Sequence, residues 1–161
     1  MKKLLGGFLA MLMLFKMSGC QKKPNVTDEN VVGLSVSCTH MAFSYSYNFK
    51  IYVQENKTLF SCDCSIDRES YNDTRVSCKD VPIEDRYFDQ LIEILKVNNV
   101  TEEVLKYKEK INWFFVADKT EYKITLFFEN DKYKDASLHF EELYEFLKHL
   151  AGLYATEVTY E

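Results

Sequence analysis

Residues 45–66 read YSYNFKIYVQENKTLFSCDCSI, and the pattern in this stretch decides the fold class. Apolar and polar side chains alternate through residues 45–53 and again through residues 60–66. Successive side chains of a β-strand point to opposite faces, so each half predicts a strand with one buried face. The intervening Glu55-Asn56-Lys57 suits a turn. The stretch therefore predicts an antiparallel hairpin that packs one face against a core.

The same alternation continues on both sides of this hairpin. Residues 32–38 form one more alternating set, in which Val32 shares a face with the other apolar side chains, and residues 75–79 form a shorter one. The connections between these strands are too short for parallel crossovers. The four strands are therefore expected to form an antiparallel meander.

Beyond residue 80 the apolar side chains recur at helical spacing. A helix is expected over residues 82–97, with Pro82 in its first turn, and an amphipathic helix over residues 140–154. Shorter elements are expected between them: a helical turn at 101–106 and strands at 111–117, 121–129 and 136–138. This order predicts a single α+β domain over residues 31–161, with a mostly antiparallel sheet and two main helices packed on one face.

The first twenty residues, MKKLLGGFLAMLMLFKMSGC, have the pattern of an export signal. Two lysines precede an apolar run over residues 4–15, which is short for a permanent membrane span but typical of a secretory signal. The end of the segment, Met17-Ser18-Gly19-Cys20, resembles the lipobox of bacterial lipoproteins. This resemblance implies that residues 1–19 are removed and that Cys20 receives the lipid. The alternative is a plain signal peptide followed by a chance cysteine.

The lipoprotein resemblance also implies where the chain resides. Lipid on Cys20 would anchor the chain to the outer face of the bacterial cell membrane, or to an outer membrane, through acyl chains such as palmitate. Residues 20–30 are polar and include Pro24, so they are expected to form a tether to the domain. The remainder resembles only small uncharacterised secreted domains of low-GC Gram-positive bacteria, which implies no activity.

Four further cysteines fall on the predicted inner faces of the strands, namely Cys38, Cys62, Cys64 and Cys78. Cysteine is among the most buried residue types, which favours buried thiols or structural disulfides. An even number of cysteines in an exported chain allows two disulfides in three pairings. The sequence leaves these pairings open.

A thiol-based redox or metal-binding module is the alternative, and it would use Cys38, His40, Cys62 and Cys64. A cysteine–histidine pair can activate a nucleophile, and four thiols can bind zinc. However, zinc knuckles usually have two to four residues between cysteines, and thiol–disulfide enzymes use C-x-x-C at a helix start. The C-x-C spacing of Cys62 and Cys64 within a strand fits neither pattern.

Charge and motifs narrow the classes of function further. The chain carries a net charge of −5 and has no basic patch, which argues against binding of nucleic acid. No nucleotide-binding, hydrolase or metalloprotease motif is present. The sequence thus predicts no catalytic, cofactor-binding or metal-binding residue, and it favours a protein that is not an enzyme.

An aromatic surface is the most suggestive feature of the domain. Tyr52 and Phe127 have the outward phase of their strands, and Phe114 and Val116 have the same phase in the strand expected at 111–117. If the helices cover only one face, these side chains form an exposed patch of the kind that marks a binding site. The alternative is that the second helix covers them. The sequence therefore favours a lipid-anchored, non-catalytic binding or envelope-accessory domain whose partner, a protein or a small molecule, is undefined.

Overall fold

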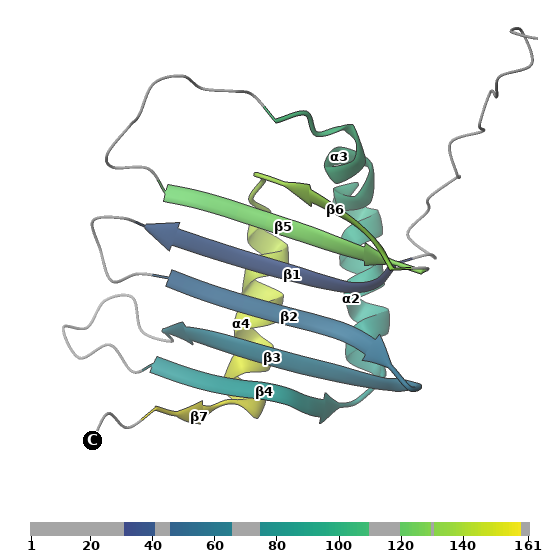
Figure 1. Cartoon of the computed structure of the whole chain (residues 1–161). Helices are drawn as coiled ribbons and strands as arrows, with labels where there is room; N and C mark the ends of the chain where they lie inside the picture. Colours follow the sequence, from purple (N-terminus) through teal and green to yellow (C-terminus); the bar gives the residue numbers. More distant parts are fainter. Residues whose placement is uncertain (1–30, 41–45, 66–74, 110–119, 130, 159–161) are drawn as a thin grey trace, which may run out of the picture.

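The structure is a computed structural model of the chain, and it describes residues 31–40, 46–65, 75–109, 120–129 and 131–158. Within these ranges it contains a seven-stranded antiparallel sheet and three helices (Figure 1). The elements in chain order are β1 (Val31–His40), β2 (Ser46–Gln54), β3 (Lys57–Ser65), β4 (Arg75–Ile83), α2 (Arg86–Val97), α3 (Val100–Lys106), β5 (Thr120–Phe128), β6 (Lys132–Ala136), α4 (Glu141–Tyr154) and β7 (Thr156–Glu157). The predicted α+β class is confirmed.

The spatial order of the strands is β6-β5-β1-β2-β3-β4-β7, and all neighbours are antiparallel. Strands β1 to β4 are neighbours in chain order, so the predicted meander is confirmed. The chain then passes behind the sheet as α2 and α3 and returns as β5, on the free side of β1 (Figure 1). As a result β1, the first strand, lies near the centre of the sheet.

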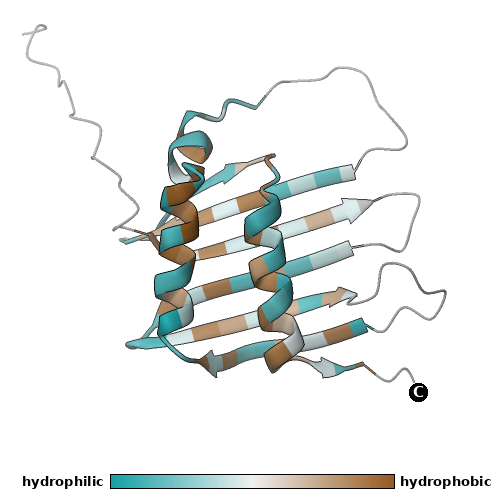
Figure 2. Cartoon of the chain, turned by 180° about the vertical axis from the view of Figure 1, so that it is seen from behind, coloured by the Kyte–Doolittle hydropathy of each residue, from teal (hydrophilic) through white to brown (hydrophobic). Residues whose placement is uncertain are grey.

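Helices α2 and α4 cover the same face of the sheet, as predicted (Figures 1 and 2). Their apolar stripes face the strands, and Leu91 and Leu95 of α2 and Leu147 and Leu150 of α4 are completely buried. These side chains meet the inner faces of the strands in one continuous core. None of the described helices is long and apolar enough to cross a membrane. No described helix lies on the opposite face, which we call the open face.

The start of the first long helix differs from the prediction. Pro82 belongs to β4, opposite Leu59, and α2 begins only at Arg86. Proline lacks a backbone N–H and is tolerated on a strand edge that has no partner. Among the described residues, β7 pairs with β4 only at Val76 and Ser77, so Pro82 lies beyond that pairing. The edge position explains why this proline extends a strand instead of starting a helix.

Three smaller expectations also need correction. A β-bulge between Val31 and Gly33 makes Val31, not Val32, the more buried of the two valines. Val53 was expected on the buried face but is 38% exposed, because it lies next to the end of β2, where Gln54 is also exposed. The strand expected at residues 136–138 is β6, which occupies Lys132–Ala136. The expected strand at 111–117 and the signal and tether, residues 1–30, lie outside the described residues.

Candidate functional site

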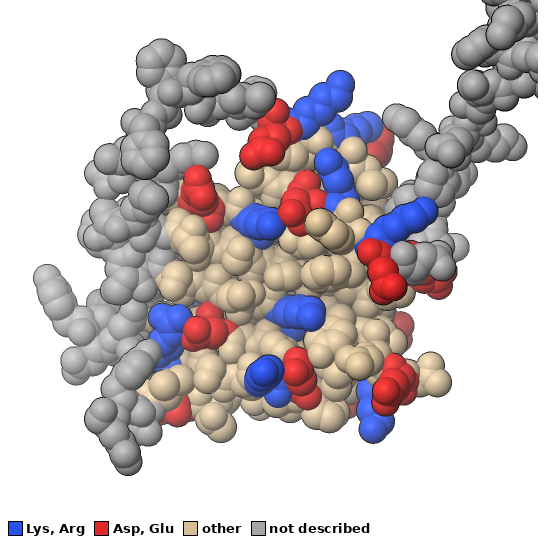
Figure 3. Space-filling model, viewed as in Figure 1, with Lys and Arg blue, Asp and Glu red and all other residues tan. Residues whose placement is uncertain are grey.

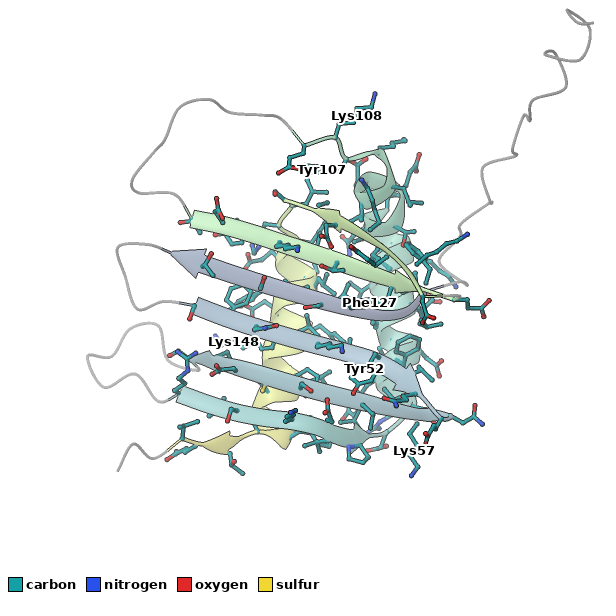
Figure 4. The ribbon with its side chains drawn as sticks, viewed as in Figure 1. Tyr52, Lys57, Tyr107, Lys108, Phe127 and Lys148 are labelled. Atoms are coloured by element: carbon teal, nitrogen blue, oxygen red, sulfur yellow. The ribbon has the colours of Figure 1, made fainter. Side chains whose placement is uncertain are left out.

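A row of apolar side chains crosses the open face at right angles to the strands. The register places Gly33 of β1 opposite Tyr52 of β2 on one side and opposite Phe127 of β5 on the other. Tyr133 of β6 extends the row beyond Phe127, and Leu59 of β3 extends it beyond Tyr52. Figure 4 shows Tyr52 and Phe127 on strands that flank β1. We call these five residues the aromatic row.

Gly33 is the centre of the aromatic row, and only glycine fits there. A Cβ atom at this position would lie 2.7 Å from Cβ of Tyr52 and 3.1 Å from the carbonyl oxygen of Ile51. Real side chains do not approach so closely, so any larger residue would push β2 away or displace Tyr52. A glycine inside a strand often marks such a close approach. Gly33 therefore leaves no side chain between the two aromatic residues.

Hydrogen bonds from β3 and β4 hold the ring of Tyr52. Its hydroxyl donates to Oδ1 of Asp80 at 2.9 Å, and the hydroxyl of Ser61 donates to the same oxygen at 2.9 Å. The backbone N–H of Asp80 donates in turn to Oγ of Ser61 at 2.8 Å. The ring of Tyr52 is thus fixed at both ends, by the backbone of β2 and by this carboxylate.

Asp80 can reach this position because β4 contains a bulge. Phe60 pairs with Val81 and Cys62 pairs with Cys78, so β4 has one residue more than β3 between these pairs. Asp80 lies in this segment with a φ of 51°, a left-handed conformation that aspartate tolerates better than most residues. Bulges reorient side chains and are frequent next to functional sites.

The charge state of this cluster follows from its contacts. Hydrogen bonds from Ser61 and Tyr52 lower the pKa of the Asp80 carboxyl below its ordinary value. Partial burial, together with the hydrogen bond to Asp80, raises the pKa of the Tyr52 hydroxyl. At neutral pH the cluster therefore consists of an ionised carboxylate and neutral hydroxyl groups.

Lys50 adds one positive charge beside the aromatic row. Its Nζ atom lies 4.2 Å from the centre of the Tyr52 ring and 5.6 Å from that of Phe127. An ammonium group at such distances is attracted by the faces of both rings. Figure 3 shows that the middle of the open face is mostly uncharged, with charged side chains of both signs spread around it.

A cavity of about 750 Å³ lies near the β6 end of the aromatic row. Tyr133 belongs to the row and also lines this cavity, together with Tyr107 and Tyr122. Lys123 and Asp135, which also line it, form an ion pair at 3.0 Å. The row and the cavity together give the β5–β6 side of the domain an aromatic and polar surface.

The sequence located part of this site. Tyr52 and Phe127 were predicted as binding residues, and the fold brings them to the two sides of Gly33. Phe114 and Val116, the other members of the predicted patch, lie outside the described residues. The pattern did not identify Lys50 or Asp80, whose positions depend on strand pairing. Gly33 did carry a signal, because an isolated glycine within a strand pattern suggests close backbone approach.

The cysteines form a separate cluster on the helix-covered face. Cys38, Cys62 and Cys64 are buried and Cys78 is half-buried, so their predicted position on the inner face is confirmed. Sγ of Cys62 lies 3.6 Å from Sγ of Cys78. Among the described residues, no group of three or more histidine, cysteine or acidic side chains could hold a metal ion. The side chain of His40 is outside the described set.

The thiol pKa values are shifted by the burial of the cluster. A hydrogen bond with Cys64 and burial raise the pKa of the Cys62 thiol, and burial together with the proximity of Cys62 raises the pKa of Cys78 to about 12. The hydrogen bond with Cys62 lowers the pKa of the Cys64 thiol. Cys64 is only 1% exposed, so a substrate cannot reach its sulfur without movement of the protein. These properties do not favour the alternative of thiol catalysis.

No protein family, curated protein or solved structure matches the chain.

Proposed function

We propose that this chain is a lipid-anchored domain at the bacterial cell surface, and that it binds a ligand on its open face without catalysing a reaction. The lipobox-like Met17-Ser18-Gly19-Cys20 supports the anchor. The aromatic row supports the binding. The absence of a recognisable catalytic motif from the sequence is consistent with a role in recognition.

The observation that carries the proposal is the fixed ring of Tyr52 beside Gly33. A side chain on an open sheet face normally moves among several rotamers, and ordering it on binding costs conformational entropy. Here the carboxylate of Asp80 already holds the hydroxyl at 2.9 Å. Such pre-organisation favours binding, because less side-chain entropy is lost when the complex forms.

The ligand class that best suits this surface is a carbohydrate. The faces of Tyr52 and Phe127 offer apolar contact to the C–H face of a sugar ring, and Gly33 places no side chain between the two residues. Lys50 can donate hydrogen bonds to ring or hydroxyl oxygens, and Asp80 can accept from hydroxyl groups. The row crosses several strands, which suits an extended chain of sugars.

Binding can be tested with the full chain in detergent and two soluble probes, the hexamers of N-acetylglucosamine and of glucose. We expect calorimetry to detect binding of at least one probe. Phe127→Ala and Tyr52→Ala should each weaken that binding at least tenfold. Leu153→Ala is the matched control, because Leu153 is an apolar residue of α4 that is 53% exposed away from the aromatic row. No binding of either probe, or equal loss in the control, would contradict the carbohydrate proposal.

The anchor is tested separately with Cys20→Ser. The unaltered chain should incorporate labelled palmitate and appear in the membrane fraction without residues 1–19. The variant should remain unlabelled and keep its signal segment. Palmitate labelling of the variant would show that Cys20 is not the lipid site.

A further inference from the structure

Cys62 and Cys78 face each other across strands β3 and β4. The register makes them direct partners, and their sulfur atoms lie 3.6 Å apart. Both side chains are on the helix-covered side of the sheet, where Sγ of Cys78 also lies 3.8 Å from the carbonyl oxygen of Phe60. We infer that Cys62 and Cys78 are joined by a disulfide in the exported protein, and that Cys38 and Cys64 remain thiols.

The backbone of the hairpin suits this bond. Residues directly opposite each other on antiparallel strands have Cα atoms about 4.5–5.5 Å apart. Disulfides span Cα distances of about 4.4–6.8 Å, so the strands need not move. The sulfur atoms need only a change of side-chain torsion to approach from 3.6 Å to bonding distance.

Other pairings are less suitable. Cys64 pairs with Val76, so no cysteine stands opposite it. Cys62 and Cys64 share a hydrogen bond and lie two positions apart on the same face of one strand. Their Cα atoms, about 6.6 Å apart, are at the upper end of the disulfide range, and their side chains leave the strand in parallel. Cys38 lies on β1, which is separated from β3 by β2. At the usual spacing of strands, β1 and β3 are about 9.6 Å apart. Among these pairs, Cys62–Cys78 alone combines facing strands with sulfur atoms 3.6 Å apart.

The reaction needs an oxidant, for which we name a disulfide, either glutathione disulfide or that of an exported thiol oxidoreductase. The thiolate of Cys78, the more exposed sulfur, attacks the oxidant and forms a mixed disulfide with release of one thiol. Cys62 then attacks Sγ of Cys78 and releases the second thiol. The two cysteines lose two electrons and two protons, and the oxidant gains both and becomes two thiols.

Burial determines when this reaction takes place. The pKa of Cys78 is raised to about 12 in the folded domain, so little thiolate exists at neutral pH. The folded, reduced protein should therefore react slowly. An exported chain meets the oxidant while it is still folding, when both thiols are accessible and have ordinary pKa values. The disulfide then closes a loop of the chain that contains residues 63–77.

Peptide mapping of the full chain tests the inference. Protein is extracted in detergent from cells that export it, with its thiols alkylated at lysis, and is digested with trypsin and with a protease that cuts before aspartate. Cuts after Lys57, Arg75 and Lys79 and before Asp63 and Asp67 place each cysteine of the cluster in its own peptide. Cys62 is then in residues 58–62, Cys64 in residues 63–66 and Cys78 in residues 76–79.

We expect peptides 58–62 and 76–79 to be linked without reduction, and peptide 63–66 to be alkylated. Linkage of 63–66 to 76–79, or alkylation of both 58–62 and 76–79, would overturn the inference. Cys64→Ser supplies a second measurement, because it should leave the linked pair of peptides unchanged. Loss of that link in a Cys64→Ser protein that remains folded by circular dichroism would also overturn it. These results do not depend on whether the open face binds a carbohydrate.

Discussion

The hydroxyl group of Tyr52 donates a 2.9 Å hydrogen bond to Oδ1 of Asp80, which lies 28 positions further along the chain. The two residues are on β2 and β4, so this bond spans β3 and joins strands that are not neighbours. It exists only because a bulge of β4 turns the carboxylate of Asp80 toward the aromatic row. The orientation of the ring in the proposed site therefore depends on the backbone of another strand.

Replacement of Asp80 should release this ring. Asp80→Ala removes the acceptor, so the ring protons of Tyr52 should show averaged environments by NMR, and affinity for a bound hexamer should fall about fivefold or more. Asp80→Asn is the control, because it keeps an acceptor oxygen and tolerates the left-handed backbone. Equal loss of affinity in both variants would indicate that the charge of Asp80, and not its hold on Tyr52, matters.

Replacing each of the two described glycines, Gly33 and Gly152, with alanine should change the stability of the domain in opposite directions. Gly33→Ala forces its Cβ to within 2.7 Å of Tyr52, so strain should lower the free energy of unfolding by about 1–3 kcal/mol. Gly152 is an exposed position of α4 with nothing within 4 Å of the added Cβ, so Gly152→Ala should raise stability by about 0.5–1 kcal/mol. Urea denaturation measures both, and a neutral Gly33→Ala would contradict the close packing at the centre of the row.

Two leucines of α4 provide a similar comparison for the core. Leu147 is completely buried against the sheet, so Leu147→Ala should destabilise the domain by about 2–5 kcal/mol. Leu153 is 53% exposed, and Leu153→Ala should change stability by less than about 0.5 kcal/mol. Similar effects of both substitutions on the urea midpoint would show that α4 does not pack on the sheet as described.

The pH dependence of stability should include a small contribution from Asp63. Two hydrogen bonds from Arg75, at 2.6 and 2.8 Å, lower the pKa of this carboxyl below its usual 3.8. A lowered pKa stabilises the fold above the unfolded pKa, and the contribution is lost as the pH falls through the folded value. Both side chains are partly exposed, so the contribution should be under about 1 kcal/mol.

Asp63→Asn isolates this contribution. At pH 7 the variant should be less stable than the unaltered chain by that amount. The difference should begin to shrink below about pH 4 and should vanish once the pH is below the lowered pKa of Asp63. Urea denaturation at the two pH values checks this. A difference that persists at pH 2 would mean that the substitution acts through packing, not through the ion pair.

The parts of the fold that depend on local periodicity could be predicted from the sequence. Alternation in residues 45–66 predicted β2, the following turn and β3, because a sheet with one buried face imposes a period of two. The apolar spacing of Leu91 and Leu95 predicted α2 for the corresponding reason. A regular helix or strand with one buried face shows its period in the spacing of its apolar residues.

The parts that depend on pairing between distant strands could not be predicted. The return of β5 beside β1 brings Phe127 next to Gly33, and no local pattern contains this neighbourhood. The bulge at Asp80 is one extra residue of β4 between two of its pairings with β3, and Pro82 continued a strand because β7 does not reach that part of the edge. The candidate site combines both effects, so of its described residues the sequence identified only Tyr52 and Phe127, with a weaker signal at Gly33.

The position of β1 has a mechanical consequence. If the chain is anchored at Cys20, any load on the tether enters the domain at Val31, the first residue of β1. This strand is held on one side by β2 over Gly33–Thr39 and on the other by β5 over Val31–His40. A pull along the strand must shear both ladders at once instead of opening them one bond at a time. A tether at Cys20 would thus apply its load to a strand that is paired on both sides.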